Sequence, residues 1–194
     1  MAARKARKDK ILDVVVGLIA EKGWLDLSLS ELAQASDVSL DQLYEAFRRK
    51  NDILWALQTR LDSEALKEIE PEDLEGEPAR DRLFDVLMTR FEVMAPYKYT
   101  LEVISEDLLQ DPRALMGWAH NEMQSLRWML DAAGLSARGF SGLARLHGLA
   151  AVWGECFHTW LKDEPGMPQT MALLDQRLAK GEKWMLRGQK YLPF

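Results

Sequence analysis

Cationic side chains and base-contacting polar side chains are concentrated in the first 50 residues. Positions 4–10 hold five basic residues and one acidic residue, and a second basic group stands at 48–50. Between the two groups lies Gln42, whose amide can pair with the edge of an adenine base. Because basic side chains neutralise phosphates and polar side chains distinguish bases, these residue types favour binding of nucleic acid.

Acidic residues in the same segment oppose that interpretation. Asp41 and Glu45 stand on either side of Gln42, together with the apolar Leu40 and Ala46. Two carboxylates facing phosphates reduce non-specific affinity, although a carboxylate can also accept a hydrogen bond from N4 of cytosine. The net charge of −6 is uneven, since residues 1–50 sum to +1 (nine basic, eight acidic) and residues 51–194 to −7 (16 basic, 23 acidic). The sequence therefore predicts a basic N-terminal arm on an acidic body.

Residues that could support catalysis or bind a metal are few and dispersed. The histidines are His120, His147 and His158, and the single cysteine is Cys156. Glu155-x-x-His158 has the spacing of a di-iron helix motif, but such a site needs two of these motifs and further glutamates. The sequence also has no phosphate-binding loop, dinucleotide fingerprint or nucleophile elbow. We therefore expect no enzyme activity, no metal and no cofactor, and we expect Cys156 to be a small buried side chain.

Two short capped helices are needed to position the N-terminal side chains. Ser28 with Glu31, and Ser39 with Gln42, have the spacing of capping boxes. The break at 36–38 separates the two helices by a short turn, which is the pattern of a helix-turn-helix. In such a motif the second helix enters the major groove, and residues 39–44 would be its base-contacting half.

Helical periodicity continues through the rest of the chain. Apolar residues from Ile11 predict a first helix that ends near Lys22, before Gly23, with the basic arm ahead of it. A charged loop at 71–78 contains prolines and a glycine and is the best boundary between segments. We expect further helices at about 53–69, 79–95, 97–110, 112–133, 141–162 and 168–188. No alternation typical of strands occurs, so the predicted fold is all-α, with a three-helix domain over 1–50 and a helical bundle over 51–194.

Residues 8 to about 60 resemble the N-terminal domain of TetR-type transcriptional regulators. The residues that carry the resemblance are Gly23, Ser28, Leu32, Ala33, Val38, Ser39, Leu43, Tyr44, Phe47, Lys50 and Leu54. Asp37 departs from the pattern, because the family usually has glycine at this turn position. The resemblance implies a DNA-binding domain, an all-helical ligand-sensing domain and a homodimer through the last two helices, at about 141–162 and 168–188.

The resemblance also implies which residues contact operator DNA. Tyr44 and Lys50 match family positions that contact phosphates, and the arm could follow the backbone or enter the minor groove. The expected DNA-binding residues are Arg4, Lys5, Arg7, Lys8, Ser28, Ser39, Leu40, Asp41, Gln42, Tyr44, Arg48 and Lys50.

Aromatic and methionine side chains are frequent in the body of the chain. Many follow helical spacing, which is typical of core residues, but adaptable side chains of these types also line pockets for apolar ligands. A small apolar effector or a lipid would then contact Phe84, Met88, Phe91, Trp118, Met123, Trp128, Trp153 and Phe157.

The stretch 143–184 resembles a second group, the lipid-binding accessory proteins of ubiquinone biosynthesis, which share the TetR-type fold without acting as repressors. Two functions are thus open: a TetR-type repressor whose DNA affinity changes with an apolar ligand, or a lipid-binding accessory protein with a vestigial helix-turn-helix. The basic start followed by apolar residues is similar to a signal peptide, but Asp13 interrupts it and no small-x-small cleavage site follows. No run approaches the ~20 apolar residues of a membrane span, so we expect a cytoplasmic protein.

Overall fold

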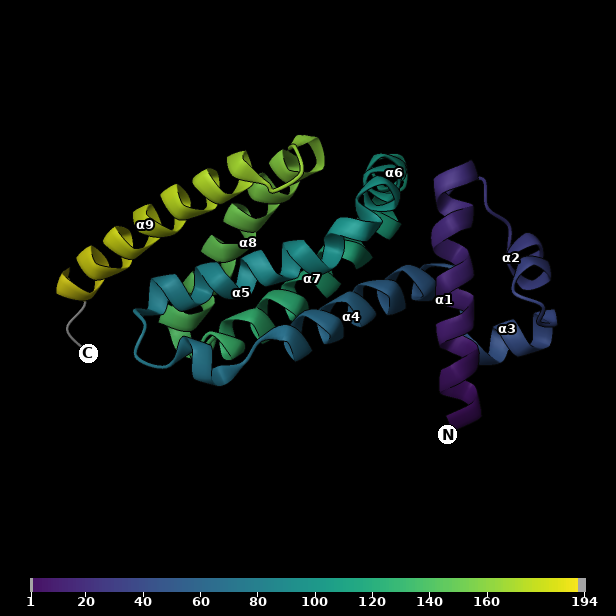
Figure 1. The fold of residues 1–194 in the computed structure, drawn as a ribbon, viewed down its shortest axis with the longest axis horizontal. Helices are drawn as coiled ribbons and strands as arrows, with labels where there is room; N and C mark the ends of the chain where they lie inside the picture. Colours follow the sequence, from purple (N-terminus) through teal and green to yellow (C-terminus); the bar gives the residue numbers. More distant parts are fainter. Residues whose placement is uncertain (1, 192–194) are drawn as a thin grey trace. The chain divides into compact units, whose positions relative to one another are not determined.

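The computed structural model describes the backbone of residues 2–191 and the side chains of residues 4–185 other than Pro71 and Asp73. Over this range the fold is all-α, as predicted, and contains no strand (Figure 1). The helices are α1 (Ala2–Lys22), α2 (Leu29–Ala35), α3 (Leu40–Ala46), α4 (Asn51–Glu68), α5 (Ala79–Met94), α6 (Lys98–Leu108), α7 (Pro112–Ala132), α8 (Gly139–Lys162) and α9 (Pro168–Tyr191). Two short 3₁₀ helices, η1 (Pro71–Leu74) and η2 (Ala95–Tyr97), precede α5 and α6.

The chain divides into two compact units. The first unit contains the chain as far as Leu61 together with Met94–Asn121, and the second contains Asp62–Val93 and the chain from Glu122 onward. Helices α4 and α7 therefore contribute to both units. The predicted division into residues 1–50 and 51–194 concerns function rather than packing, and it stays a prediction.

The start of α1 differs from the sequence-based expectation. We expected a basic arm ahead of a helix that starts near Ile11, but the helix runs without interruption from Ala2 to Lys22. The reason is local: residues 2–10 contain alanine, arginine and lysine, which are good helix formers, and no glycine or proline. The basic residues therefore project from a helix whose next turns are anchored by the buried Ile11 and Val15.

In the first unit, the loop after α1 is attached to α6. Gly23 ends α1 in the left-handed conformation (φ 86°), as predicted, and Trp24 behind it is buried. The carboxylate of Asp107 on α6 accepts hydrogen bonds from the backbone N–H of Trp24 (2.5 Å) and of Leu25 (3.2 Å). The loop that leads into α2 is therefore fixed by a side chain far away in sequence.

The core of the second unit combines apolar packing with a buried cation. Phe91 on α5 stacks on Trp153 of α8, with ring centroids 4.5 Å apart, and also contacts Trp160. Beside this cluster lies Arg90, which is 2% exposed. Cys156 is buried as predicted, and burial raises the pKa of its thiol to about 11.

Candidate nucleic-acid interface

Both predicted capping boxes are present. The Ser28 hydroxyl accepts from the Glu31 backbone N–H (3.1 Å), while the Glu31 carboxylate accepts from the Ser28 backbone N–H (3.0 Å). The Ser39 hydroxyl accepts from the Gln42 N–H (3.4 Å), and Gln42 Oε1 accepts from the Ser39 N–H (3.2 Å). These bonds satisfy backbone donors that helix starts leave open, so α2 and α3 begin at defined residues.

The turn between α2 and α3 depends on a left-handed aspartate. Asp37 has φ 52°, so it adopts the conformation for which the TetR-type pattern usually has glycine. The backbone N–H of Val38 donates to the Ala33 carbonyl (3.0 Å), and Ser36 is buried in the turn. Aspartate tolerates this region better than most residues, so the turn retains its shape without glycine.

Helix α3 has a buried face and an exposed face. Leu43 and Ala46 are buried against the rest of the first unit. Leu40 and Tyr44 are 55% and 57% exposed, and Asp41 is also exposed. Glu45 is exposed as well, so the exposed side chains of α3 include one apolar, one phenolic and two acidic residues.

Two polar side chains of α3 already interact with Ser39, the residue that caps the start of this helix. Gln42 is half-buried, and its carbonyl oxygen already accepts the capping bond from Ser39. A hydrogen bond from the Ser39 side chain lowers the pKa of Asp41. Bidentate pairing of Gln42 with adenine would require the capping bond to open, whereas its NH₂ group is available without that change.

The basic residues at the start of α1 lie against α3. Arg4 donates to the backbone carbonyl of Glu45 (3.0 Å), and Arg7 forms an ion pair with the Glu45 carboxylate (3.1 Å). Lys5 is exposed. The predicted arm is therefore the first part of helix α1, and two of its arginines contact α3 directly.

The next cations of α1 contact the same motif. Lys8 lies 5.1 Å above the ring of Phe47, which closes α3. Lys10 lies 3.5 Å from the Asp37 carboxylate in the turn. The exposed Lys10–Asp37 pair contributes less than about 1 kcal/mol to stability. It places positive charge beside the turn, as Arg7 does beside Glu45.

The basic residues after α3 divide into exposed and structural ones. The Arg48 guanidinium lies 4.5 Å above the Tyr44 ring, and both side chains are exposed. Lys50 is half-buried, and its ammonium donates to the carbonyls of Trp24 (2.5 Å) and Leu25 (3.1 Å). Burial lowers the pKa of Lys50. Its contacts connect the start of α4 to the loop before α2, a role that the sequence did not predict.

The predicted ligand-binding residues occupy different environments. Phe91, Trp153 and Phe157 belong to one aromatic cluster, in which Trp153 and Phe157 are 6.3 Å apart. Met88 is buried, Trp128 is exposed, and the remaining three are half-buried: Phe84, Trp118 and Met123. None of the eight lines either of the two cavities described next, and the cluster around Trp153 is the packed core that helical spacing also allowed.

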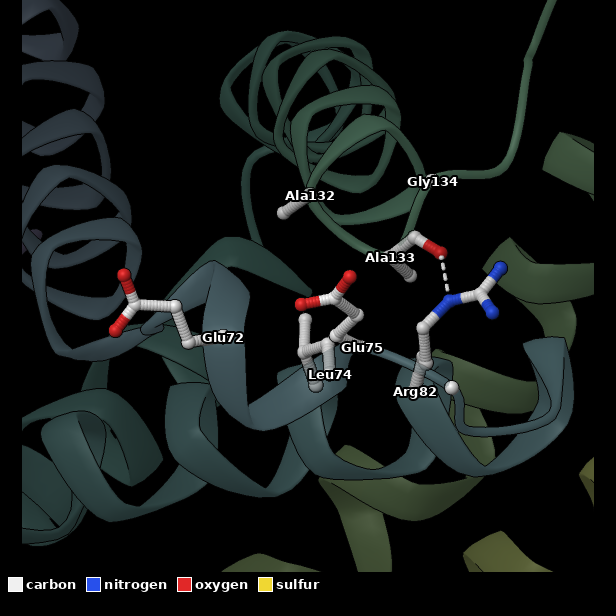
Figure 2. Close-up of a pocket in the computed structure, with 8 residues that line it drawn as sticks. Glu72, Leu74, Glu75, Arg82, Ala132, Ala133 and Gly134 are labelled. Atoms are coloured by element: carbon white, nitrogen blue, oxygen red, sulfur yellow. Dashed lines mark hydrogen bonds between the residues drawn. The ribbon is translucent and has the colours of Figure 1, made fainter.

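Two cavities lie in the second unit. One, of about 450 Å³, is shallow and lies between the loop before α5 and the end of α7 (Figure 2). There Arg82 donates to the Ala133 carbonyl (2.9 Å) and to the Glu77 carbonyl (2.5 Å), and the exposed Glu72 and Glu75 also line the cavity. The other, of about 350 Å³, is mainly apolar and lies between α5, α8 and α9. The sequence gives no sign of this cavity, because its wall contains small residues and arginines as well as apolar ones.

The described residues show neither a cluster of metal ligands nor a membrane-spanning helix. Across the described residues, no three histidine, cysteine or acidic side chains are grouped as metal ligands would be. Glu155 of the Glu-x-x-His motif forms a bidentate ion pair with Arg177. No helix in the described range is sufficiently long and apolar to cross a membrane.

A capped α2, a left-handed turn and an exposed α3 packed on α1 define a helix-turn-helix protein with an all-helical body. No protein-family model and no curated protein matches the sequence. Among solved structures, a TetR transcriptional regulator from Nitrosomonas europaea is 22% identical, with a TM-score of 0.72 over 89% of this chain and 96% of its own. A TetR regulator from a Rhodococcus species is 18% identical (TM-score 0.62, 94% and 96%), and a TerR/AcrR-family regulator from Aquifex aeolicus is 20% identical (TM-score 0.56, 92% and 99%). These similarities establish the TetR-type fold over nearly the whole chain.

Proposed function

We propose that the protein is a TetR-type transcriptional regulator that binds operator DNA. The observation that carries the proposal is the exposed face of α3, capped at Ser39 and held on α1, in a chain with the fold of solved regulators. A helix that is anchored on one face and free on the other can enter a major groove without rearrangement of the domain. In this proposal it acts in the bacterial cytoplasm, and it is not an enzyme.

Specific side chains have distinct roles in this proposal. Leu40, Asp41 and Gln42 contact base edges, while the helix starts at Ser28 and Ser39 and the exposed Tyr44, Arg48 and Lys5 face phosphates. Arg4, Arg7 and Lys8 contribute positive charge and support α3. Lys50 acts by holding the loop before α2 rather than by direct contact, since its ammonium is already bound to two carbonyls.

The regulator is proposed to be a homodimer through α8 and α9. These helices lie side by side (Figure 1), and their outer surface exposes Phe140, Leu143 and Ala151 on α8 and Met171 on α9. Exposed apolar and small side chains along paired helices suit a two-fold interface. A dimer would present two recognition helices to successive major grooves, about 34–36 Å apart.

Regulation is proposed to follow from ligand binding in the body. A small apolar ligand that fits one arrangement of the helices better than another shifts the population toward that arrangement. The separation of the two α3 helices in the dimer then changes, and DNA affinity falls. Repression is the simplest outcome of such release from an operator.

Selection from random DNA duplexes at two salt concentrations tests the DNA-binding proposal. We expect a selected sequence that binds with salt-dependent affinity. The double variant Tyr44→Phe, Arg48→Ala should weaken binding strongly, and the matched double variant Tyr99→Phe, Arg113→Ala, at exposed sites on α6 and α7, should not. Absence of any salt-sensitive binding would overturn the proposal.

A second candidate is a lipid-binding accessory protein that keeps the fold without binding DNA. The observation that favours it is the acidic character of α3, where Asp41 and Glu45 are exposed carboxylates. Native mass spectrometry of the purified protein distinguishes the two. A retained isoprenoid or phospholipid without DNA binding favours this candidate, while DNA binding without retained lipid excludes it.

A further inference from the structure

The cavity between α5, α8 and α9 has the size and lining of a ligand site. Its volume of about 350 Å³ lies in the range of small-molecule sites, roughly 300–1,000 Å³. Its apolar wall is formed by leucines and a valine from all three helices and the loop before α8, with Trp184 and Met185 of α9. The aliphatic members are Leu83, Leu135, Leu149, Val152 and Leu178.

Glycines keep this space open. Gly148 on α8 and Gly181 on α9 both line the cavity, and a Cβ added at either position would meet no atom within 4 Å. Side chains at these two positions would therefore extend into empty space rather than into neighbouring residues. Both glycines are exposed, so they lie where the cavity opens to solvent, and larger side chains at 148 and 181 could reach into it without displacing the helices.

The charge on the cavity wall is positive. Arg80, Arg145 and Arg177 line it, against the single acidic residue Glu182. Arg177 is paired with Glu155, and Arg80 with Asp81.

Arg145 differs from the other two arginines. One of its N–H groups donates to the Ser136 carbonyl (2.5 Å), and within the described part of the chain it has no acidic partner. A guanidinium that is oriented by one bond and retains unused N–H donors is suited to bind a carboxylate.

We propose that this cavity binds an apolar molecule that carries a single carboxylate, of the fatty-acid class. The aliphatic chain lies against Leu83, Leu149 and Leu178, and the carboxylate is bound by Arg145. An alcohol of equal length would leave the Arg145 guanidinium without an ionic partner, and an amine would place a second cation beside it. The site deepens the proposed regulation by an apolar ligand, and its binding chemistry is independent of DNA.

Binding is tested on the full-length protein by calorimetry, with octanoate, decanoate and dodecanoate and with decanol and decylamine as matched probes. We expect saturable binding of at least one carboxylate, about tenfold or more tighter than the alcohol, since hydrogen bonds to charged groups have that strength.

Variants locate the site and keep the proposal falsifiable. Arg145→Gln should remove the preference for the carboxylate, and Gly148→Leu should abolish binding by filling the cavity. Arg113→Gln, at an exposed site on α7, is the charge-matched control, and circular dichroism verifies that each variant is folded. Absence of binding by all three carboxylates, equal affinity for decanol, or full binding by folded Gly148→Leu would overturn the proposal.

A separate DNA-binding assay with and without decanoate reports on regulation. If decanoate binds but DNA does not, the site stands and the regulator proposal fails. If DNA binds and no carboxylate does, the regulator proposal stands and the proposed carboxylate site fails.

Discussion

Glu45 on α3 interacts with two arginines of α1. Its carboxylate faces Arg7, and its carbonyl accepts from Arg4. The ion pair is exposed, so it adds little to stability. Its effect on the proposed DNA binding should be larger, because a phosphate would have to compete with Glu45 for these two cations.

Glu45→Gln should therefore increase non-specific DNA affinity. Release of Arg7 for one more phosphate contact should steepen the plot of log affinity against log salt by about 0.9. Titration of a labelled duplex at several salt concentrations measures both quantities, with Glu92→Gln, an exposed site on α5, as the control. An unchanged or lower non-specific affinity would contradict this prediction.

The two short helices of the motif are defined mainly by their first turns. Each has seven residues, too few for stability in isolation. The capping boxes and the buried faces provide the stability that seven residues alone would not. The orientation of α3 thus depends on bonds at Ser39 and on Leu43 and Ala46 beneath it.

Ser39→Ala should destabilise the protein by about 1 kcal/mol, because it removes the acceptor for the Gln42 N–H. Urea denaturation followed by circular dichroism measures the change. Ser30→Ala, at an exposed site in α2, should change stability by less than about 0.5 kcal/mol. Equal effects of the two substitutions would argue against the cap.

Glu31 should make the stability of α2 dependent on pH. Lys22 and Ser28 lower the pKa of this carboxyl from 4.5 to about 2. Because the folded pKa is the lower one, the stabilisation is complete above pH 4.5 and is lost as the pH falls toward 2. The difference in free energy of unfolding between wild type and Glu31→Gln should shrink over that window, and a constant difference would contradict the assignment.

Within the second unit, one buried arginine joins four helices. Arg90 on α5 pairs with Asp62 of α4 (2.9 Å) and Glu122 of α7 (2.5 Å), and it lies 4.3 Å from the Trp153 ring of α8. The Ser125 hydroxyl donates to Asp62. Desolvation disfavours the charge of Arg90, but its two acidic partners outweigh this and raise its pKa. This network fixes which faces of the four helices meet.

Arg90→Met should destabilise the protein by about 3–5 kcal/mol, because it leaves two acidic side chains without their cation in the interior. Arg90→Lys should restore only part of the loss, since lysine lacks the planar fork that reaches both carboxylates. Denaturant unfolding of both variants measures the effect. A loss below about 1 kcal/mol for Arg90→Met would show that the network contributes little.

The proposed dimer makes a prediction for the whole assembly. Ala151→Arg places a charged side chain on the exposed surface of α8 and should convert a dimer to monomers, since a desolvated unpaired charge at an interface is costly. Sedimentation velocity measures the state. The matched substitution Ala119→Arg, at an exposed site on α7, should leave the dimer intact, and an unchanged Ala151→Arg dimer would exclude this interface.

Local features of this protein were readable from the amino-acid sequence. Both capping boxes, the glycine after α1 and the all-α class follow from spacing and backbone preference, which act between near neighbours. The contacts of Arg7 with Glu45 and the buried position of Arg90 do not, because they join residues far apart in the chain. The same holds for the cavity between α5, α8 and α9, whose walls come from three helices. Such features depend on how helix faces pack, and only the tertiary structure determines that.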